Sequence, residues 1–211
     1  MKTCLAVLLA VATMGCLPVV AAEKPLPKVL IIGDSISIGY TDPVTRLLAG
    51  KADVKRVPDN CQSTVYALEH IRQWIGEEHW DVIHFNWGIW DMHHLDDWRI
   101  RTTPVEYERN LRRLVDILKS TKARLIWAST TPVRTSSTGW WVSESDIPRY
   151  NAVAARVMRD NAIPVDDLYS VILPKLSELR TDDGCHYKPE GSEFLAQSVA
   201  KSILAALESA R

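Results

Sequence analysis

The strongest constraint on this chain is a regular alternation of short apolar runs with longer segments of helical periodicity. The apolar runs are rich in β-branched residues and occupy positions 28–32, 53–57, 82–86, 124–129 and 164–165. The helical patterns occupy positions 42–49, 64–76, 104–120, 146–160 and 189–207. Strands that alternate with helices form parallel βαβ units, in which helices cover both faces of the sheet. We therefore expect an α/β fold with a central parallel sheet of about five strands.

Sequence signals also mark the start of one helix and two long loops. Thr103, Pro104 and Glu106 match a capping box with proline at the first helical position. Residues 88–103 and 132–145 are long connections for a compact domain. Loops of this length often carry binding or catalytic residues, so we expect functional side chains in them.

The N-terminal segment, residues 1–22, is typical of a secretory signal peptide. A positive charge at Lys2 precedes an apolar stretch, and small residues end the segment at Ala22. The apolar stretch is too short and too interrupted to favour a retained membrane helix, and we expect no membrane span elsewhere. Cleavage after Ala22 would leave one domain over residues 23–211 in a secreted or periplasmic protein.

A lipoprotein signal is the alternative for this segment. Cys16 would then be the anchored residue. Thr13 stands where such signals usually have leucine, so simple secretion is the preferred interpretation.

The charge balance bears on the partners of the chain. Removal of the signal takes away only the charge of Lys2, so the net charge changes from −1 to −2. Proteins that bind nucleic acids usually carry a basic excess or a basic run, and this chain has neither. We expect no nucleic-acid partner.

The first apolar run ends directly in polar residues, Gly33, Asp34 and Ser35, and Ser37 follows. Ligands of an open parallel sheet bind outside the carboxyl ends of its strands. The hydroxyl of Ser35 would lie at that edge. Alternatively, Asp34 or Ser35 simply caps the helix that follows. We expect Ser37 and Asp34 to have structural roles in the turn.

A second polar cluster lies near the end of the chain, in the stretch TDDGCHYKPEG at residues 181–191. It contains Asp183 and His186 three residues apart. A serine nucleophile needs a base, and the base needs a carboxylate that orients it. Each residue alone could be an ordinary loop residue. Together with Ser35 they indicate a Ser–His–Asp arrangement.

These two motifs carry a resemblance to a known family. IIGDSIS resembles the first motif of the SGNH, or GDSL-type, hydrolases, and DGCHYKPEG resembles their last motif. IPRYNAVAARVMRDNAIPVDDLYSVI resembles the helix–strand segment before that last motif. The resemblance implies a flavodoxin-like three-layer α/β/α fold. It also implies ester hydrolysis with Ser35 as nucleophile, His186 as base and Asp183 as the orienting acid, and we expect no cofactor and no metal.

The family's oxyanion hole is expected to use the N–H of the serine, a glycine N–H after the second strand and an asparagine side chain after the third. The N–H of Ser35 carries over directly. The stretch VPDNCQST after the second strand has no glycine. We therefore expect a backbone N–H near Asn60, Cys61 or Gln62 to contribute to the hole.

The asparagine of the family pattern is also replaced, because Trp90 occupies its position after Gly88. Asn86 is the expected substitute as a side-chain donor, with Asn60 as its rival. The alternative role for a buried asparagine at a strand end is to bind neighbouring backbone.

The two cysteines of residues 23–211, Cys61 and Cys185, lie in loops that the fold would place beside the active site. A disulfide between them is possible in an oxidising compartment if their Cα atoms lie within about 7 Å. The alternative is two small buried thiols.

Aromatic and histidine side chains in the two long loops are candidates for substrate binding: Trp90, His93, Trp140 and Trp141. A metal site at His93 and His94 is disfavoured because no second cluster has ligand spacing. Aromatic faces beside a polar site suit sugar rings. An O-acetyl ester on a carbohydrate is the favoured substrate. The alternatives are a lysophospholipase or acyl-ester hydrolase of the same fold, or a catalytically impaired carbohydrate-binding protein.

Overall fold

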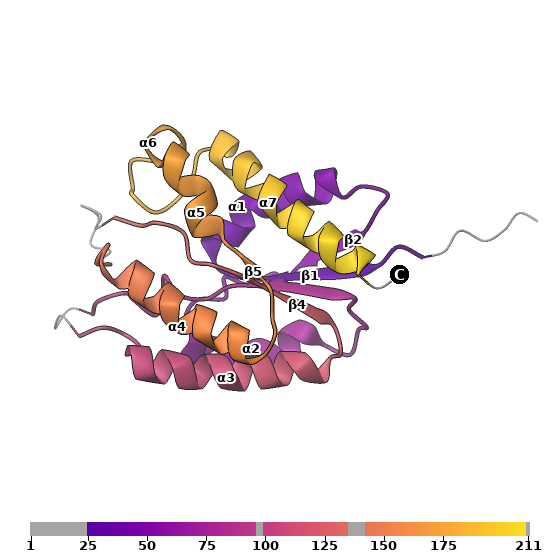
Figure 1. The fold of residues 1–211 in the computed structure, drawn as a ribbon, viewed down its shortest axis with the longest axis horizontal. Helices are drawn as coiled ribbons and strands as arrows, with labels where there is room; N and C mark the ends of the chain where they lie inside the picture. The colour runs from indigo at the N-terminus through magenta and orange to yellow at the C-terminus, as the bar shows by residue number, and fades with distance from the viewer. Residues whose placement is uncertain (1–24, 96–98, 135–141, 210–211) are drawn as a thin grey trace, which may run out of the picture.

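The computed structural model describes residues 25–95, 99–134 and 142–209. A five-stranded parallel sheet lies at the centre of this part of the chain (Figure 1). Its strands are β1 (Lys28–Ile32), β2 (Asp53–Arg56), β3 (Val82–Phe85), β4 (Arg124–Ala128) and β5 (Val165–Asp166). They are arranged in the order β2-β1-β3-β4-β5. All neighbouring strands are parallel, as the alternating sequence pattern predicts.

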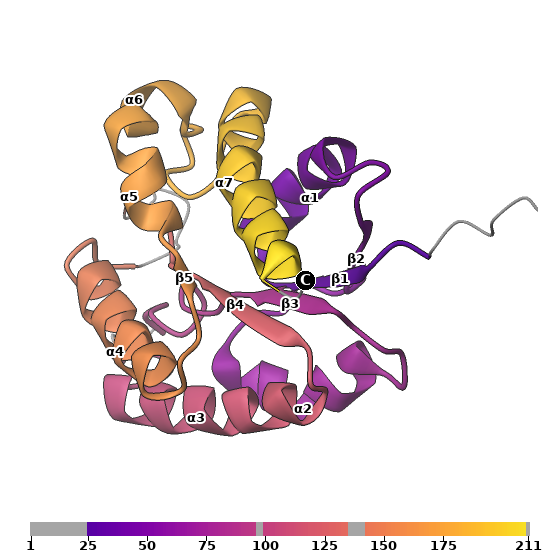
Figure 2. The ribbon, with the colours of Figure 1, turned by 45° about the vertical axis from the view of Figure 1, so that its right-hand side comes forward.

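Two layers of helices cover the sheet, and the view in Figure 2 separates them clearly. One layer contains α1 (Ser35–Leu47), α5 (Leu168–Ile172) and α7 (Pro189–Glu208). The other contains α2 (Thr64–Ile75), α3 (Pro104–Ser120) and α4 (Asp146–Asp160). A 3₁₀ turn (Leu173–Lys175) and α6 (Leu176–Leu179) follow α5. The expected three-layer α/β/α fold is confirmed, and its strand order is that of flavodoxin.

The predicted start of the first helix is wrong. The sequence pattern placed it at about residue 42, but α1 begins at Ser35 and Pro43 lies inside it. The side chain of Asp34 supplies the cap, since its Oδ1 accepts the N–H of Ile36 at 3.0 Å. Aspartate is a common N-cap residue, so the helix can begin directly after it.

The predicted capping box at the start of α3 is confirmed. Thr103 and Glu106 form the capping box, with reciprocal bonds of 3.3 Å and 3.0 Å between side chain and backbone N–H. The buried stripe of α3 includes Leu114 and Val115, each with no exposed surface. Trp127 on β4 is 1% exposed and packs edge-on against Phe85 of β3, with ring centroids 5.4 Å apart. Among the described residues, no helix combines the length and the apolar character needed to cross a bilayer.

The topology determines where a ligand can bind. The chain moves from β1 to β2 on one side and then crosses over to β3 on the other side of β1. In open α/β sheets the crevice lies at such a reversal, outside the carboxyl ends of the strands. The segments that follow β1, β2 and β3 therefore converge there.

A matched pair of valines on α3 tests the packing of this layer. Val115→Ala is expected to lower the free energy of unfolding by about 2 kcal/mol, because it removes buried methyl groups and leaves a cavity. Val105 is 78% exposed on the same helix, so Val105→Ala should change stability by less than about 0.5 kcal/mol. Urea denaturation measures both. Equal effects of the two substitutions would contradict the assigned helix face.

Candidate active site

The turn between β1 and α1 places Ser35 at the edge of the sheet. Only Gly33 and Asp34 separate the last residue of β1 from Ser35, the first residue of α1. A Cβ on Gly33 would lie 3.0 Å from the Cβ of Ser37, so a side chain there would require Ser37 to shift. Asp34 is 2% exposed, and its carboxylate caps the helix. Asp34 and Ser37 thus have the structural roles expected of them, since the Ser37 hydroxyl donates to the Asp34 carbonyl at 2.7 Å.

The loop before α7 brings His186 and Asp183 to this turn. His186 Nε2 lies 2.8 Å from Ser35 Oγ, and His186 Nδ1 lies 2.7 Å from Asp183 Oδ2. The three side chains form one continuous hydrogen-bonded chain from carboxylate to hydroxyl. Both His186 and Asp183 keep open surface, with side chains 47% and 41% exposed.

Local hydrogen bonds hold the Asp183 carboxylate in place. Its Oδ1 accepts the N–H groups of Cys185 at 2.8 Å and His186 at 2.9 Å, and the Thr181 hydroxyl at 2.7 Å. Partial burial raises the pKa of this carboxyl, but these donors and His186 outweigh that effect and leave the pKa well below its usual range. Gly184 adopts a φ of 81°, the left-handed conformation that lets the loop turn between the acid and the base.

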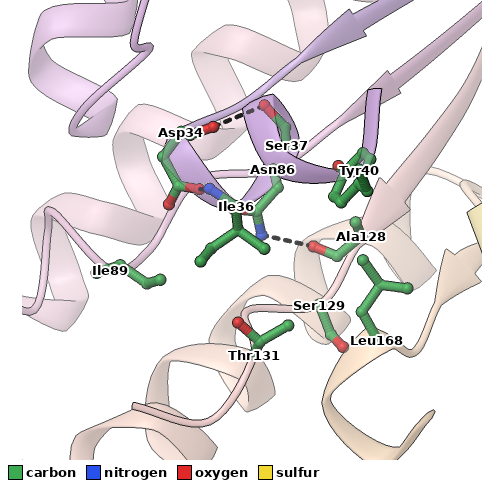
Figure 3. A pocket seen from close by; sticks show the side chains of 10 residues that line it. All are labelled: Asp34, Ile36, Ser37, Tyr40, Asn86, Ile89, Ala128, Ser129, Thr131 and Leu168. Atoms are coloured by element: carbon green, nitrogen blue, oxygen red, sulfur yellow. Dashed lines mark hydrogen bonds between the residues drawn. The ribbon is translucent and has the colours of Figure 1, made fainter. Parts of the chain in front are cut away.

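Asn86 does not lie as a side-chain donor of an oxyanion hole would. Its Nδ2 donates to the Ala128 carbonyl at 2.7 Å and lies 3.4 Å from Thr130 Oγ1. Both N–H bonds therefore have partners on the segment at and after the end of β4. Figure 3 shows the side chain of Asn86 directed toward Ala128. This is the alternative role named above, in which the asparagine binds neighbouring backbone.

The loop after β2 supplies backbone groups beside the serine. The N–H of Cys61 donates to the Gly33 carbonyl at 3.3 Å, so this particular N–H is committed to the fold. Gln62 adopts a φ of 45°, a conformation that favours glycine, in the loop where a glycine was expected. Asn60 is half-buried, and no described residue bonds its buried Oδ1. Asn60 and Gln62 remain the candidates for a backbone donor in this loop.

The family is decided by comparison with known proteins. The model of the GDSL-like lipase/acylhydrolase family matches residues 31–194. The chain belongs to this family. Its members are carboxylic ester hydrolases, which is the enzyme class that the sequence motifs predict. No curated protein matches the chain in sequence.

Solved structures with the same fold include several esterases. The acetyl xylan esterase AlAXEase is 16% identical, with a TM-score of 0.71 over 83% of this chain and 99% of that one. A lipase/acylhydrolase from Enterococcus faecalis is 22% identical, with a TM-score of 0.70 over 84% and 95%. A catalytic mutant of Axe2, an acetylxylan esterase from Geobacillus stearothermophilus, is 16% identical, with a TM-score of 0.68 over 84% and 94%.

Of the residues predicted to bind substrate in this hydrolase, the structure describes Trp90 and His93. Trp90 is half-buried, and the guanidinium of Arg101 lies over its ring, 5.8 Å from the centroid. His93 Nδ1 lies 3.2 Å from the same guanidinium. Trp140 and Trp141 lie outside the described residues. In the described part of the chain, no group of three or more His, Cys, Asp or Glu side chains could hold a metal ion.

The two cysteines that the structure describes, Cys61 and Cys185, are free thiols, so the possible bridge between them is not formed in it. Cys61 has no exposed surface, and its Sγ lies 3.8 Å from the Asp59 carbonyl. Burial raises the pKa of each thiol to about 12, which leaves both protonated near neutral pH.

A small cavity of about 10 Å³ lies behind the nucleophile turn, as Figure 3 shows. Its lining comes from the first turns of α1 and from the segments after β3, β4 and β5, with Asp34, Ile36, Asn86 and Thr131 among them. It has room for about one water molecule. A substrate of the hydrolase must therefore bind outside this cavity, on the open side of Ser35.

Two residues that the sequence did not single out connect the loops of the site. Arg56, at the end of β2, bonds to backbone carbonyls on both sides of the crevice. Asp91, fully buried after β3, accepts the N–H of Thr64 at 3.0 Å and its hydroxyl at 2.6 Å. For Arg56, the only available signal was a charged residue at the end of a strand. Asp91 lies in the loop between β3 and α3, and in neither case does the sequence identify a partner.

Asp91 gives the hydrolase a pH-dependent stability. Burial raises its pKa to about 7, against the opposing bonds from Thr64. The folded protein thus binds a proton that the unfolded chain releases near pH 4. The free energy of unfolding should fall as pH rises between about 4 and 7, by up to about 1.4 kcal/mol per pH unit.

Asp91→Asn should flatten this slope, whatever its effect on stability at a single pH. Urea denaturation at several pH values between 4 and 8 measures the slope. Asp116→Asn changes an exposed carboxylate of α3 and should leave the slope of the wild type unchanged. The same slope for Asp91→Asn and the wild type would contradict the assignment.

Proposed function

We propose that the protein is a secreted esterase that cleaves carboxylic esters through an acyl-enzyme on Ser35. The observation that carries the proposal is the hydrogen-bonded chain from Asp183 through His186 to Ser35 Oγ. This is the geometry that a general base and its orienting acid need in order to activate a serine.

Each side chain has one task in the proposed reaction. His186 Nε2 takes the proton of Ser35 Oγ as the oxygen attacks the ester carbonyl, and it returns that proton to the departing alcohol. Asp183 holds His186 with Nδ1 protonated and stabilises the imidazolium that forms. Water then attacks the acyl-enzyme with His186 as the base, which releases the carboxylic acid and restores Ser35.

The oxyanion of the tetrahedral intermediate needs donors at this turn. We assign the N–H of Ser35, which belongs to the first turn of α1, where N–H groups have no acceptor within the helix. The second donor comes from the loop after β2, with Asn60 and Gln62 as candidates. Asn86 is not assigned to the hole because its amide binds Ala128.

For the substrate, we propose an O-acetyl ester of a carbohydrate. Two of the structural neighbours are acetyl xylan esterases. Each is 16% identical to this chain, so the similarity is one of fold alone. The loop after β3 carries the half-buried Trp90, and an aromatic side chain of this kind suits a sugar ring. Secretion rests on the signal-like residues 1–22, with lipoprotein anchoring at Cys16 as its alternative.

Substitutions in the triad test the chemistry with p-nitrophenyl acetate. Ser35→Ala should abolish turnover above background, because among the described residues only the Ser35 hydroxyl bonds to His186 Nε2. Asp183→Asn should lower kcat by about 10²-fold to 10⁴-fold, because the amide favours the wrong tautomer of His186.

Asp182→Asn is the matched control, since Asp182 is an exposed neighbour in the same loop. Its kcat should stay within about twofold of the wild type. Equal background turnover by the wild type and Ser35→Ala would refute the esterase and favour a catalytically impaired binding protein.

The substrate class is tested by a series of p-nitrophenyl esters from acetate to palmitate, followed by acetylated xylan. We expect kcat/KM to fall by at least about tenfold between acetate and octanoate, and acetate to be released from the polysaccharide. A preference for long acyl chains, or release of fatty acid from lysophospholipid, would instead establish the acyl-ester alternative.

A further inference from the structure

Arg56 connects the two loops from which the proposed oxyanion donors come. It is the last residue of β2, and its backbone pairs in register with Ile31 of β1. Its half-buried side chain therefore reaches the carboxyl edge of β1, where the nucleophile turn begins. From there its guanidinium contacts backbone on both sides of the crevice.

The contacts of Arg56 on the nucleophile turn are specific. Nη2 donates to the Gly33 carbonyl at 2.8 Å and lies 3.4 Å from the Asp34 carbonyl. Nε donates to Ser37 Oγ at 3.0 Å, and that hydroxyl in turn donates to the Asp34 carbonyl. The guanidinium of Arg56 and the hydroxyl of Ser37 therefore fix the backbone carbonyl groups of this turn.

The same guanidinium binds the loop after β2. Nη2 donates to the Asp59 carbonyl at 2.9 Å, and Nη1 donates to the Val57 carbonyl. A planar guanidinium can serve several acceptors at fixed angles, whereas an ammonium group is a single point charge. Arg56 thus sets the position of this loop relative to the nucleophile turn.

The direction of these bonds matters for the chemistry. In a trans peptide the C=O of one residue and the N–H of the next point in opposite directions. The carbonyl of Asp34 shares its peptide group with the N–H of Ser35, and the carbonyl of Asp59 shares its group with the N–H of Asn60. A cation that holds both carbonyls turns both N–H groups away from itself, and hydrogen bonding at the carbonyl strengthens the N–H as a donor.

We propose that Arg56 is a positioning residue of the esterase, which orients the N–H groups of Ser35 and Asn60 toward the oxyanion that forms on the substrate. The proposal rests on the proposed function and deepens it. It assigns the second oxyanion donor to Asn60 rather than Gln62. It also assigns to a β2 side chain the task of holding both donors.

Arg56→Met tests this role because methionine fills similar space without donors. With p-nitrophenyl acetate, kcat should fall by about 10²-fold, as for the loss of an oxyanion donor, while KM changes by less than about threefold. The pH at half-maximal kcat/KM on the acid side should not move, because the contacts of His186 and Asp183 are untouched. Arg56→Lys keeps the charge without the fork and should give an intermediate kcat.

Chemical rescue separates positioning from folding. Arg56→Ala should regain at least about tenfold in kcat with tens of millimolar guanidinium chloride, and nothing with the same concentration of sodium chloride. Arg112→Met is the matched control, since Arg112 is an arginine of α3 whose hydrogen bonds, within the described part of the chain, go to the side chains of Glu108 and Asp160. It should lose stability without loss of kcat.

The outcomes distinguish this proposal from the proposed function. Equal turnover by the wild type and Ser35→Ala would remove the esterase itself. If wild-type activity depends on Ser35 but the kcat of Arg56→Met stays within about twofold of the wild-type kcat, only the role of Arg56 is overturned. An effect of Arg56→Met on KM alone would overturn that role as well. If Arg56→Met does not fold, the kcat of Arg56→Lys and the rescue of Arg56→Ala decide the question. A wild-type kcat for Arg56→Lys, or no rescue of Arg56→Ala by guanidinium, would also overturn the role of Arg56.

Discussion

The tight turn from β1 into α1 is the constraint on which the rest of the site depends. The Asp34 carboxylate caps α1 at the N–H of Ile36, so the helix starts almost as soon as the strand ends. Ser35 is thereby fixed at the carboxyl edge of a strand that has neighbours on both sides. His186, Asp183 and the oxyanion donors must all lie near this serine. The parallel topology makes this possible because the carboxyl ends of all the strands lie at one edge of the sheet.

The sequence predicted the fold well, because the fold depends on local patterns, and in the structure hydrogen bonds join the triad candidates Asp183, His186 and Ser35. The alternation of strands and helices, the Thr103 cap and the Asp183–His186 spacing are each visible in a few residues. The start of α1 was missed because the helical pattern was read from residue 42 onward, whereas the cap at Asp34 starts the helix at Ser35. The partners of Asn86 and Arg56 could not be predicted, since Ala128 and Gly33 are brought to them only by the folded sheet.

Polar side chains outside the triad join the loops of the site into one unit. Arg56 connects the turn after β1 to the loop after β2. Asp91 connects the segment after β3 to Thr64 at the start of α2. Arg56 and Asp91 bind backbone groups, so these bonds can persist when the neighbouring side chains change. In this chain, these bonds hold the loop after β2, which lacks the expected glycine, and the loop after β3, where Trp90 stands in place of the expected asparagine.

The placement of acid and base on one short loop has a kinetic consequence. Asp183 holds His186 through bonds made within residues 181–186, so their mutual geometry does not depend on the sheet. Among the described residues, the hydrogen bond from His186 to Ser35 joins this pair to the nucleophile, and Arg134 holds the same loop through the carbonyls of Gly184 and Asp182. Because acid and base lie on one loop, any displacement of that loop would separate both from Ser35 in a single step.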